Sequence, residues 1–465
     1  MEIKNQSVTS NPLATESIGK LMGKFAIPAI ISNIVAALYN IVDQIFIGQK
    51  LGTLGNAATN VVFPLVMIMT TFAMMFGVGG SSNFSLLLGQ GDNEKAGKVI
   101  GNSVTLMVIS GFLISIMSFV FLKPLMILFG GADTVLSYSV EYAGILLIGC
   151  PFYIIGIGGS QLMRADGSPR LSMFCTLIGA VLNIILDPIF IFSFNMGMTG
   201  AALATIIGQF VSAMIVIWYL KKFKSVKLHK EHFKLGKDAV LPIFSLGVAS
   251  GLHQIGVTCY QIVMNNTLVH YGEQSVYGRD IPLACVGIIS KVNVIFSSII
   301  LGISQSCQPI FGFNFGAGNY NRVKKTFKVA IIAVTLISVI AFLSYQIFPR
   351  QLIRIFGDGS ELYFEFAIKY FRIFMALVVI AGFQILASNF FSSIGKGQLG
   401  IVTSMSRQIF FLLPLIVIMP LFFGIDGVLY AGPIADGAAG ILSITLVIRE
   451  MKKWPPKLKE LVGNE

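Results

Sequence analysis

Residues 89–95 read Gly-Gln-Gly-Asp-Asn-Glu-Lys, and residues 316–322 read Gly-Ala-Gly-Asn-Tyr-Asn-Arg, 227 positions further along the chain. Each segment follows a long apolar stretch. Other short motifs recur at a spacing of 227 or 228 residues: Leu128-Phe-Gly130 with Ile355-Phe-Gly357, Gly197-x-x-Gly200 with Gly424-x-x-Gly427, and Arg164-Ala-Asp-Gly167 with Ser392-Ser-Ile-Gly395. A spacing shared across most of the chain indicates two related halves.

The apolar stretches between these motifs determine the fold class. Of the 465 residues, 55% are hydrophobic and 12% charged, which is more apolar surface than a soluble core of this size could bury. Stretches of about 20 apolar residues match the thickness of a bilayer, and lipid offers backbone groups no hydrogen-bond partners, so these stretches should be helices. We therefore expect an all-α integral membrane protein with twelve transmembrane helices, near 21–48, 57–80, 99–121, 139–161, 170–193, 199–219, 239–270, 281–307, 327–348, 365–388, 401–423 and 428–449.

Basic residues collect in alternate loops. With the predicted spans, 24 of the 33 lysine and arginine residues lie on one side of the membrane and five on the other. The positive-inside rule makes the basic side, with both termini, cytoplasmic. Because six spans separate equivalent motifs, the two six-helix bundles have the same orientation and form a parallel pseudo-twofold repeat. The expected parts are a cytoplasmic N-terminal segment (1–20), an N-lobe (21–219), a basic cytoplasmic linker (220–238), a C-lobe (239–449) and a cytoplasmic tail (450–465).

Two acidic residues lie inside predicted spans, where a charge costs roughly 2.5–3.5 kcal/mol and needs a partner or a purpose. Tyr39 precedes Asp43 by one helical turn, and Asn183 precedes Asp187 by one turn. Counted from the outer ends of their spans, Asp43, Asp187 and Thr205 share a layer roughly 8–9 Å below the outer boundary.

The residue after Asp187 adds a backbone feature to this layer. Pro188 has no N–H group, so it should leave the carbonyl of Ile184 without its helical donor and kink the helix. The oxygen atoms in the layer suit Na⁺ and suit a proton equally well. The structural alternative is that the two acids only cap helix ends near the interface.

A second set of residues gives weaker candidates for a substrate cavity: Met67, Met74, Arg164, Lys291, Arg407 and Asp436. Each has a structural alternative. Methionine at helical spacing usually packs in a core, lysine and arginine inside a span can reach the interface, and Asp436 follows Pro433 in a region where the helix could break.

Other function classes lack support. The formal net charge of +12 does not indicate nucleic-acid binding, because the basic residues follow the loops. The five cysteines lie in apolar spans without CxxC spacing, and we find no P-loop, metal-ligand cluster or nucleophile motif. We therefore expect no enzyme activity, no cofactor and no metal beyond a Na⁺ ion at Asp43 and Asp187.

The chain resembles the multidrug and toxic compound extrusion (MATE) family, and within it the bacterial MepA-like and DinF-type branch. The resemblance covers about residues 20–450. Its carriers are Asp43-Gln-Ile-Phe-Ile-Gly48, Arg164-Ala-Asp-Gly-Ser-Pro-Arg170, Asn183-x-x-x-Asp187-Pro188, Gly197-x-x-Gly200-Ala-Ala-x-Ala-Thr205 and Pro433-x-x-Asp436. Carried over by position, the family's amino-terminal cation or proton coupling site falls on Tyr39, Asp43, Asn183, Asp187 and Thr205, the residues already singled out by depth.

The resemblance implies a V-shaped pair of lobes that exports cationic or amphipathic drugs by alternating access, in exchange for H⁺ or Na⁺. It also implies a multi-pass protein of the bacterial cell membrane whose partners are small-molecule drugs and membrane lipids, and we expect a monomer. The main rival is a flippase for lipid-linked oligosaccharides or peptidoglycan precursors. Such a cleft should be rich in arginine and lysine for pyrophosphate, whereas this chain has few basic residues at membrane depth.

Overall fold

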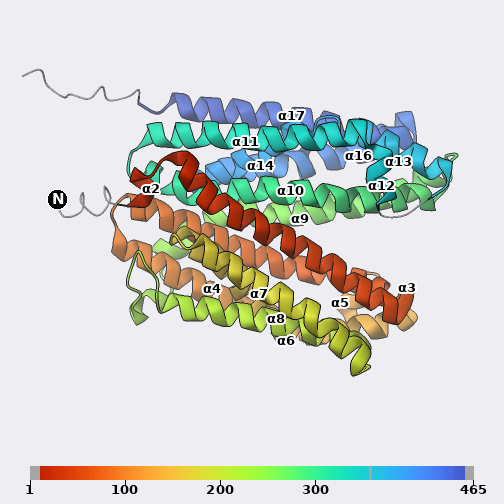
Figure 1. Cartoon of the computed structure of the whole chain (residues 1–465), viewed down its shortest axis with the longest axis horizontal. Coiled ribbons are helices and arrows are strands. Elements are labelled where there is room, and N and C mark those ends of the chain that lie inside the picture. The colour runs from red at the N-terminus through yellow and green to blue at the C-terminus, as the bar shows by residue number, and fades with distance from the viewer. Residues whose placement is uncertain (1–10, 356–358, 456–465) are drawn as a thin grey trace, which may run out of the picture.

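The computed structural model describes residues 11–355 and 359–455, and the predictions for residues 1–10, Gly357 and 456–465 fall outside this range. The described residues form helices and loops without a β-strand, which confirms the all-α expectation. Figure 1 shows the helices as one elongated bundle, and α2 (Pro12–Thr15) and the end of α17 (Ile425–Lys452) lie at the same end of it.

The first helix after α2 contains two predicted spans. α3 (Ile18–Gly89) has 72 residues, and a straight helix of that length would be roughly 110 Å long, far more than a membrane is thick. At Gly52 the backbone leaves the helical region (φ 63°, ψ −148°), a conformation that glycine adopts without a Cβ clash. Figure 1 shows α3 running to one end of the bundle and returning, so the expected spans 21–48 and 57–80 are its two arms.

The remaining helices of the first half follow the predicted spans closely. They are α4 (Asn93–Val120), α5 (Leu122–Leu128), α6 (Asp133–Ala165), α7 (Pro169–Pro188), η1 (Ile189–Ser193) and α8 (Gly197–Leu220). Then follow the short helix η2 (Lys230–Phe233) within the basic segment and, in the second half, α9 (Lys237–Glu273), α10 (Asp280–Gly316), α11 (Tyr320–Ile347), α12 (Pro349–Arg354), α13 (Glu361–Ile373), α14 (Val378–Ser393), α15 (Gly397–Met405), η3 (Ser406–Leu412), α16 (Leu413–Phe423) and α17.

The span count agrees with twelve once bends are considered. Among the described residues, ten helices are long and apolar enough to cross a membrane, and the pair α13 and α14, bent by 54°, makes eleven. Because α3 is counted once there but has two arms, the predicted twelve are accounted for. The expected continuous helix 365–388 is wrong in detail, since residues 374–377 form tighter turns: Ala376 N–H bonds to the Ile373 carbonyl, and Val378 N–H to that of Met375.

The buried core shows where the two halves meet. One cluster joins the first half to the segments of the second half nearest the basic end of the bundle, including Ile243, Phe311, Phe390 and Trp454. A separate cluster, which includes Met264, Tyr345 and Phe371, lies entirely within the second half. The halves therefore share a hydrophobic core at the basic end and have separate packing toward the other.

At that shared end the helix backbones touch. A Cβ added to Gly79 of α3 would lie 2.0 Å from the Ile243 carbonyl oxygen of α9, and one added to Gly247 would lie 1.8 Å from the Met75 carbonyl oxygen. Any larger residue at either glycine would force α3 and α9 apart. The bundle is thus tightly closed at the end that carries the basic segment.

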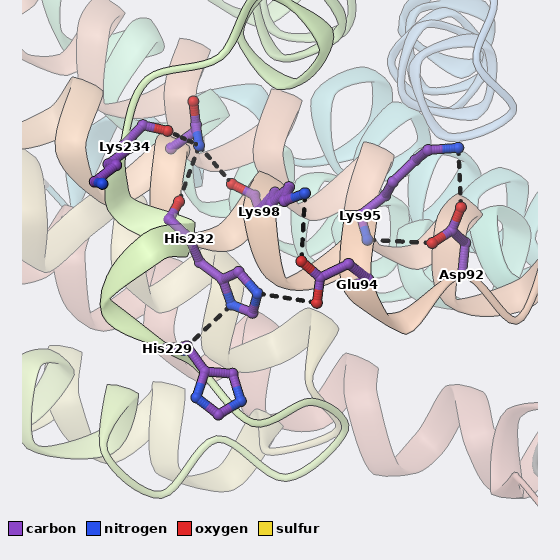
Figure 2. Close-up of polar contacts among 8 residues, drawn as sticks. Asp92, Glu94, Lys95, Lys98, His229, His232 and Lys234 are labelled. Atoms are coloured by element: carbon purple, nitrogen blue, oxygen red, sulfur yellow. Dashed lines mark hydrogen bonds and ion pairs between the residues drawn. The ribbon is translucent and has the colours of Figure 1, made fainter.

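The basic segment 220–238 is fastened to the first half (Figure 2). Asn102 of α4 donates to the carbonyls of His232 and Lys234, at 2.9 and 3.0 Å, and accepts from the Gly236 N–H. The buried ring of His232 contacts Glu94, and its hydrogen bond, together with that of Lys98, lowers the pKa of Glu94. The segment therefore packs on α4 and is not a free tether.

Candidate functional site

The two acidic side chains singled out in the sequence meet. Asp43 lies on the first arm of α3 and Asp187 on the last turn of α7, with relative exposures of 8% and 0%. Their carboxyl groups lie close enough to interact electrostatically with each other. The two acids therefore come together in the interior of the first half, whereas their common depth in the membrane stays a prediction.

An amide and a hydroxyl complete this layer. Asn183 Nδ2 donates to Asp187 Oδ1 at 3.3 Å and to Thr205 Oγ1 of α8 at 3.2 Å. The one-turn spacing of Asn183 and Asp187 brings these side chains together, as the sequence predicted. Three helices therefore contribute to one buried polar cluster.

The cluster has more acceptors than donors. Asp43 Oδ1, Asp187 Oδ2 and Asn183 Oδ1 are all buried without a hydrogen-bond partner. A buried acceptor without a donor costs about 1–3 kcal/mol, and more when it carries charge. Three such atoms in one cluster make a site that a cation or a proton would stabilise.

Tyrosines surround the acids, and the sequence indicated only one of them. Tyr39 interacts electrostatically with both carboxyl groups. Tyr142 of α6 also interacts with both and lies near Thr205. Tyr153, which interacts with Tyr39, shares a 2.7 Å hydrogen bond with Thr70. Tyr142 and Tyr153 lie inside the predicted span 139–161, and a phenol within an apolar stretch was the signal that could have revealed them.

Pro188 disturbs the helix but does not end it. The α-helical turns of α7 give way directly after Pro188 to the wider π-helical turns of η1. Missing helical hydrogen bonds are commonly accommodated by such a widening. The predicted disruption beside Asp187 is therefore present as a change of helix type.

The candidates for a substrate cavity lie in different places. Arg164 is buried and donates to Gln305 Oε1 of α10 at 2.8 Å, where the two halves are in contact. Met67 and Met74 are half-buried, and each accepts a glutamine side-chain amide, from Gln254 and Gln161 respectively. The two methionines are thus less buried than core neighbours such as Met69.

The charged candidates of the second half separate into a pair and a single residue. Arg407 of η3 and Asp436 of α17 form a buried ion pair. Tyr260 and Tyr370 interact electrostatically with both members. Lys291 is exposed and forms no ion pair within the part of the chain described. Arg407 and Asp436 are thus paired with each other, whereas their role in a cavity stays a prediction.

Metal-ligating side chains do not cluster. In the described residues, no group of three or more histidine, cysteine, aspartate or glutamate side chains could hold a metal ion. The five cysteines are all free thiols. Any ion at the acidic pair would therefore need amide, hydroxyl or backbone oxygen atoms as further ligands.

Comparisons with known proteins agree over nearly the whole chain. Multidrug export protein MepA of Staphylococcus haemolyticus (strain JCSC1435) is 26% identical over 432 residues, which cover 93% of each chain. Its counterpart from Staphylococcus aureus (strain N315) is 26% identical over 92% of this chain and 93% of its own.

Solved structures share the fold. DinF-BH, described as a MATE multidrug transporter, superimposes with a TM-score of 0.86 at 32% identity, over 94% of this chain and 96% of that one. A MOP superfamily transporter from Pyrococcus furiosus superimposes with a TM-score of 0.88 at 23% identity, over 97% and 99% of the two chains.

A sequence profile identifies the family. The MatE profile matches residues 28–189 and 249–418, one region in each half, and these two regions include Asp43, Asp187 and Arg407. The chain therefore belongs to the MatE family of membrane transporters.

Proposed function

We propose that this protein is a secondary active transporter, not an enzyme, that exports cationic amphipathic compounds in exchange for protons. The relatives named as multidrug export proteins and multidrug transporters support the export of drugs. These relatives do not favour the alternative, a flippase for lipid-linked precursors. The pairing of Arg407 with Asp436 further reduces the number of free cations at membrane depth that could bind pyrophosphate.

The contact between Asp43 and Asp187 carries the proposal. Two ionised carboxylates offer only acceptors to each other, so a hydrogen bond between them requires a shared proton. Two buried carboxylates next to each other repel strongly, which disfavours the state in which both are ionised. We propose H⁺ as the coupling ion because a single proton would satisfy two of the three acceptors that lack donors.

Four side chains have positioning roles in this mechanism: Asn183, Thr205, Tyr39 and Tyr142. Asn183 donates to one oxygen of Asp187 and leaves the other without a donor. Loss of the proton would leave two adjacent negative charges, which we expect to push the first arm of α3 away from α7 or to attract a cationic drug. Protonation would reverse both effects, so drug and proton bind in alternation.

The two sequence halves are the moving parts in this proposal, with lobes at 21–219 and 239–449. The segment 220–238 would move with the first lobe, because Asn102 and Asp166 hold its backbone. By the positive-inside rule the basic end is cytoplasmic, which also places both termini there. The shared core and the touching backbones at that end then correspond to a state closed toward the cytoplasm.

The cellular setting follows from the same reasoning. We propose a multi-pass protein of a bacterial plasma membrane, as in the staphylococcal relatives, with lipids as its surroundings and a monomer as its functional unit. Each net charge that moves inward gains about 2.3 kcal/mol per 100 mV of membrane potential, so an exchange that moves one net charge inward per cycle would sustain a drug gradient of tens-fold across the membrane.

Efflux from cells expressing the protein tests the proposal. Ethidium or norfloxacin efflux should stop when the proton gradient is collapsed with a protonophore and continue when only the Na⁺ gradient is removed. If a Na⁺ gradient stimulated efflux and a pH gradient had no effect on it, the coupling ion would be Na⁺ and not H⁺. An absence of drug efflux under every gradient would contradict the transport proposal itself.

A further inference from the structure

A groove lies on the outer face of the bundle, away from the acidic pair. It has a volume of about 420 Å³ and runs between α7 and α8. α7 contributes Leu171, Phe174 and Ile178, and α8 contributes Val211, Met214 and Trp218 among others. Figure 1 shows α7 and α8 along one edge of the bundle, on the side opposite α17. The groove therefore opens away from the second half and toward the surrounding lipid.

The packing of the two helices explains the groove. Cys175 Sγ donates to the Ser212 carbonyl at 3.1 Å, and Ser212 Oγ donates to the Cys175 carbonyl at 2.9 Å. These small side chains allow the two backbones to approach closely. The larger side chains of Phe174, Ile178 and Trp218 are exposed and line the groove beside this helix contact.

The length and position of the groove match one leaflet. From Leu171 to Ile178 the helix rises about 10 Å, most of the roughly 15 Å of hydrocarbon in half a bilayer. α7 begins at Pro169 and α8 ends at Leu220, so the groove reaches the end of the bundle that carries the basic segment. It is thus a channel for an acyl chain of the leaflet on the basic side.

The mouth of the groove is basic. Arg170 lies directly before Leu171, and Lys221 and Lys222 follow α8; all three are exposed. Lys222 Nζ lies 4.4 Å from the centre of the Trp218 ring, which holds an ammonium group at the groove entrance. In the described ranges 11–355 and 359–455, none of these three cations forms an ion pair with an acidic side chain.

From these observations we infer that the groove between α7 and α8 is a binding site for an anionic phospholipid of the basic-side leaflet. One acyl chain lies along Phe174 and Met214, and the phosphate headgroup is held by Arg170, Lys221 and Lys222. The same rim repels the cationic compounds that we propose as cargo, which separates this site from the transport pathway. A free phosphate ion would leave the apolar part of the groove unused.

The two tryptophans of the chain allow a direct test. Trp218 lines the groove, and Trp454 is buried elsewhere against Phe315, so a Trp454→Phe protein reports on the groove alone. This protein is reconstituted into phosphatidylcholine bilayers with rising fractions of a lipid that carries brominated acyl chains, a contact quencher of indole fluorescence. We expect brominated phosphatidylglycerol to quench Trp218 at a mole fraction on the order of tenfold lower than brominated phosphatidylcholine.

Charge-removing variants decide between a specific site and general annular lipid. The Arg170→Gln, Lys221→Gln, Lys222→Gln triple variant should lose the preference for the anionic lipid. The matched control is the triple variant Lys324→Gln, Lys325→Gln, Lys328→Gln. It removes three charges from α11 at the basic end of the bundle and should keep the preference for the anionic lipid. An excess of inorganic phosphate should leave the quenching unchanged.

Two results would overturn the proposal. One is equal quenching by both brominated lipids in the parent protein, which would indicate neutral annular lipid or a groove covered by a second copy. The other is an unchanged preference in the Arg170, Lys221, Lys222 triple variant. Elution of both triple variants at the parent's position in size-exclusion chromatography verifies that folding is preserved.

Discussion

Each half of the molecule buries carboxyl groups among tyrosines, but the two halves neutralise them differently. In the first half, Asp43 faces Asp187, and no cationic side chain is within the cluster as far as the described residues show. In the second half, Asp436 is paired with Arg407. Tyr142 and Tyr370, 228 positions apart in the sequence, lie beside the first and the second cluster respectively.

In the proposed mechanism, this difference separates a cluster that exchanges ions from one that does not need to. A buried carboxylate with an internal guanidinium partner is neutralised by the protein itself. A pair of carboxyl groups without one depends on a proton or cation that must come from outside. We therefore propose that the cluster of the first half takes part in coupling and that the cluster of the second half stabilises the fold.

The largest effect should come from the acids of the first half. Asp43→Asn and Asp187→Asn should each reduce ethidium efflux to the background of cells without the protein, because an amide cannot release a proton to the other side. Both variants should be at least as heat-stable as the parent, since each removes a source of carboxylate repulsion. Full efflux in both variants would remove the acidic pair from the mechanism.

Removing the arginine of the second half should affect stability more than coupling. Arg407→Leu leaves Asp436 buried and unpaired, and breaking such a pair typically costs about 3–5 kcal/mol. The double variant Arg407→Leu, Asp436→Leu should recover most of this loss, because no charge stays buried. Thermal unfolding of the purified proteins measures both changes, and a double variant as unstable as the single one would show that the pair does more than neutralise itself.

The smallest expected effect on efflux concerns Tyr142 and Tyr370, which occupy corresponding positions in the two halves. Tyr142→Phe removes the hydroxyl that interacts with Thr205 and the two acids. An interaction of about 1 kcal/mol, the size of one neutral hydrogen bond, corresponds to a roughly fivefold slower initial efflux. Tyr370→Phe should leave the efflux rate nearly unchanged, since its neighbours form an ion pair that does not exchange protons. Equal effects of the two substitutions would mean that both clusters take part in coupling.

Much of the fold could be predicted from the sequence. The apolar stretches required helices, and the spacing of about 227 residues indicated a repeat. The alternating basic loops predict that both ends of the chain lie on one side, which stays a prediction. The features of the fold that were not predicted, such as a break within a span, are only weakly indicated by the local sequence. The break between α13 and α14 falls on Phe374, Met375, Ala376 and Leu377, none of which disfavours a helix strongly.

The candidate site was predictable where it repeats a helical period. Tyr39 with Asp43 and Asn183 with Asp187 are one turn apart, and counting from the span ends placed Thr205 at the same depth. Tyr142 was missed because tyrosine near the end of a span is ordinary at a membrane interface. The partner of Arg407 was not predictable, because Asp436 lies on another helix, 29 residues away.

Taken alone, the sequence determined the solvent in which this chain folds, the number and type of its spans, the duplication and the unusual depth of its acidic residues, because these follow from composition and periodicity along one dimension. Only the tertiary structure decided that Asp43 meets Asp187 without a counter-charge while Asp436 meets Arg407, that the halves share a core only at the basic end, and that α7 and α8 leave a lipid-sized groove. These depend on which faces of separate helices are turned toward each other, and helix rotation and tilt in a bilayer are set by packing between helices rather than by hydropathy.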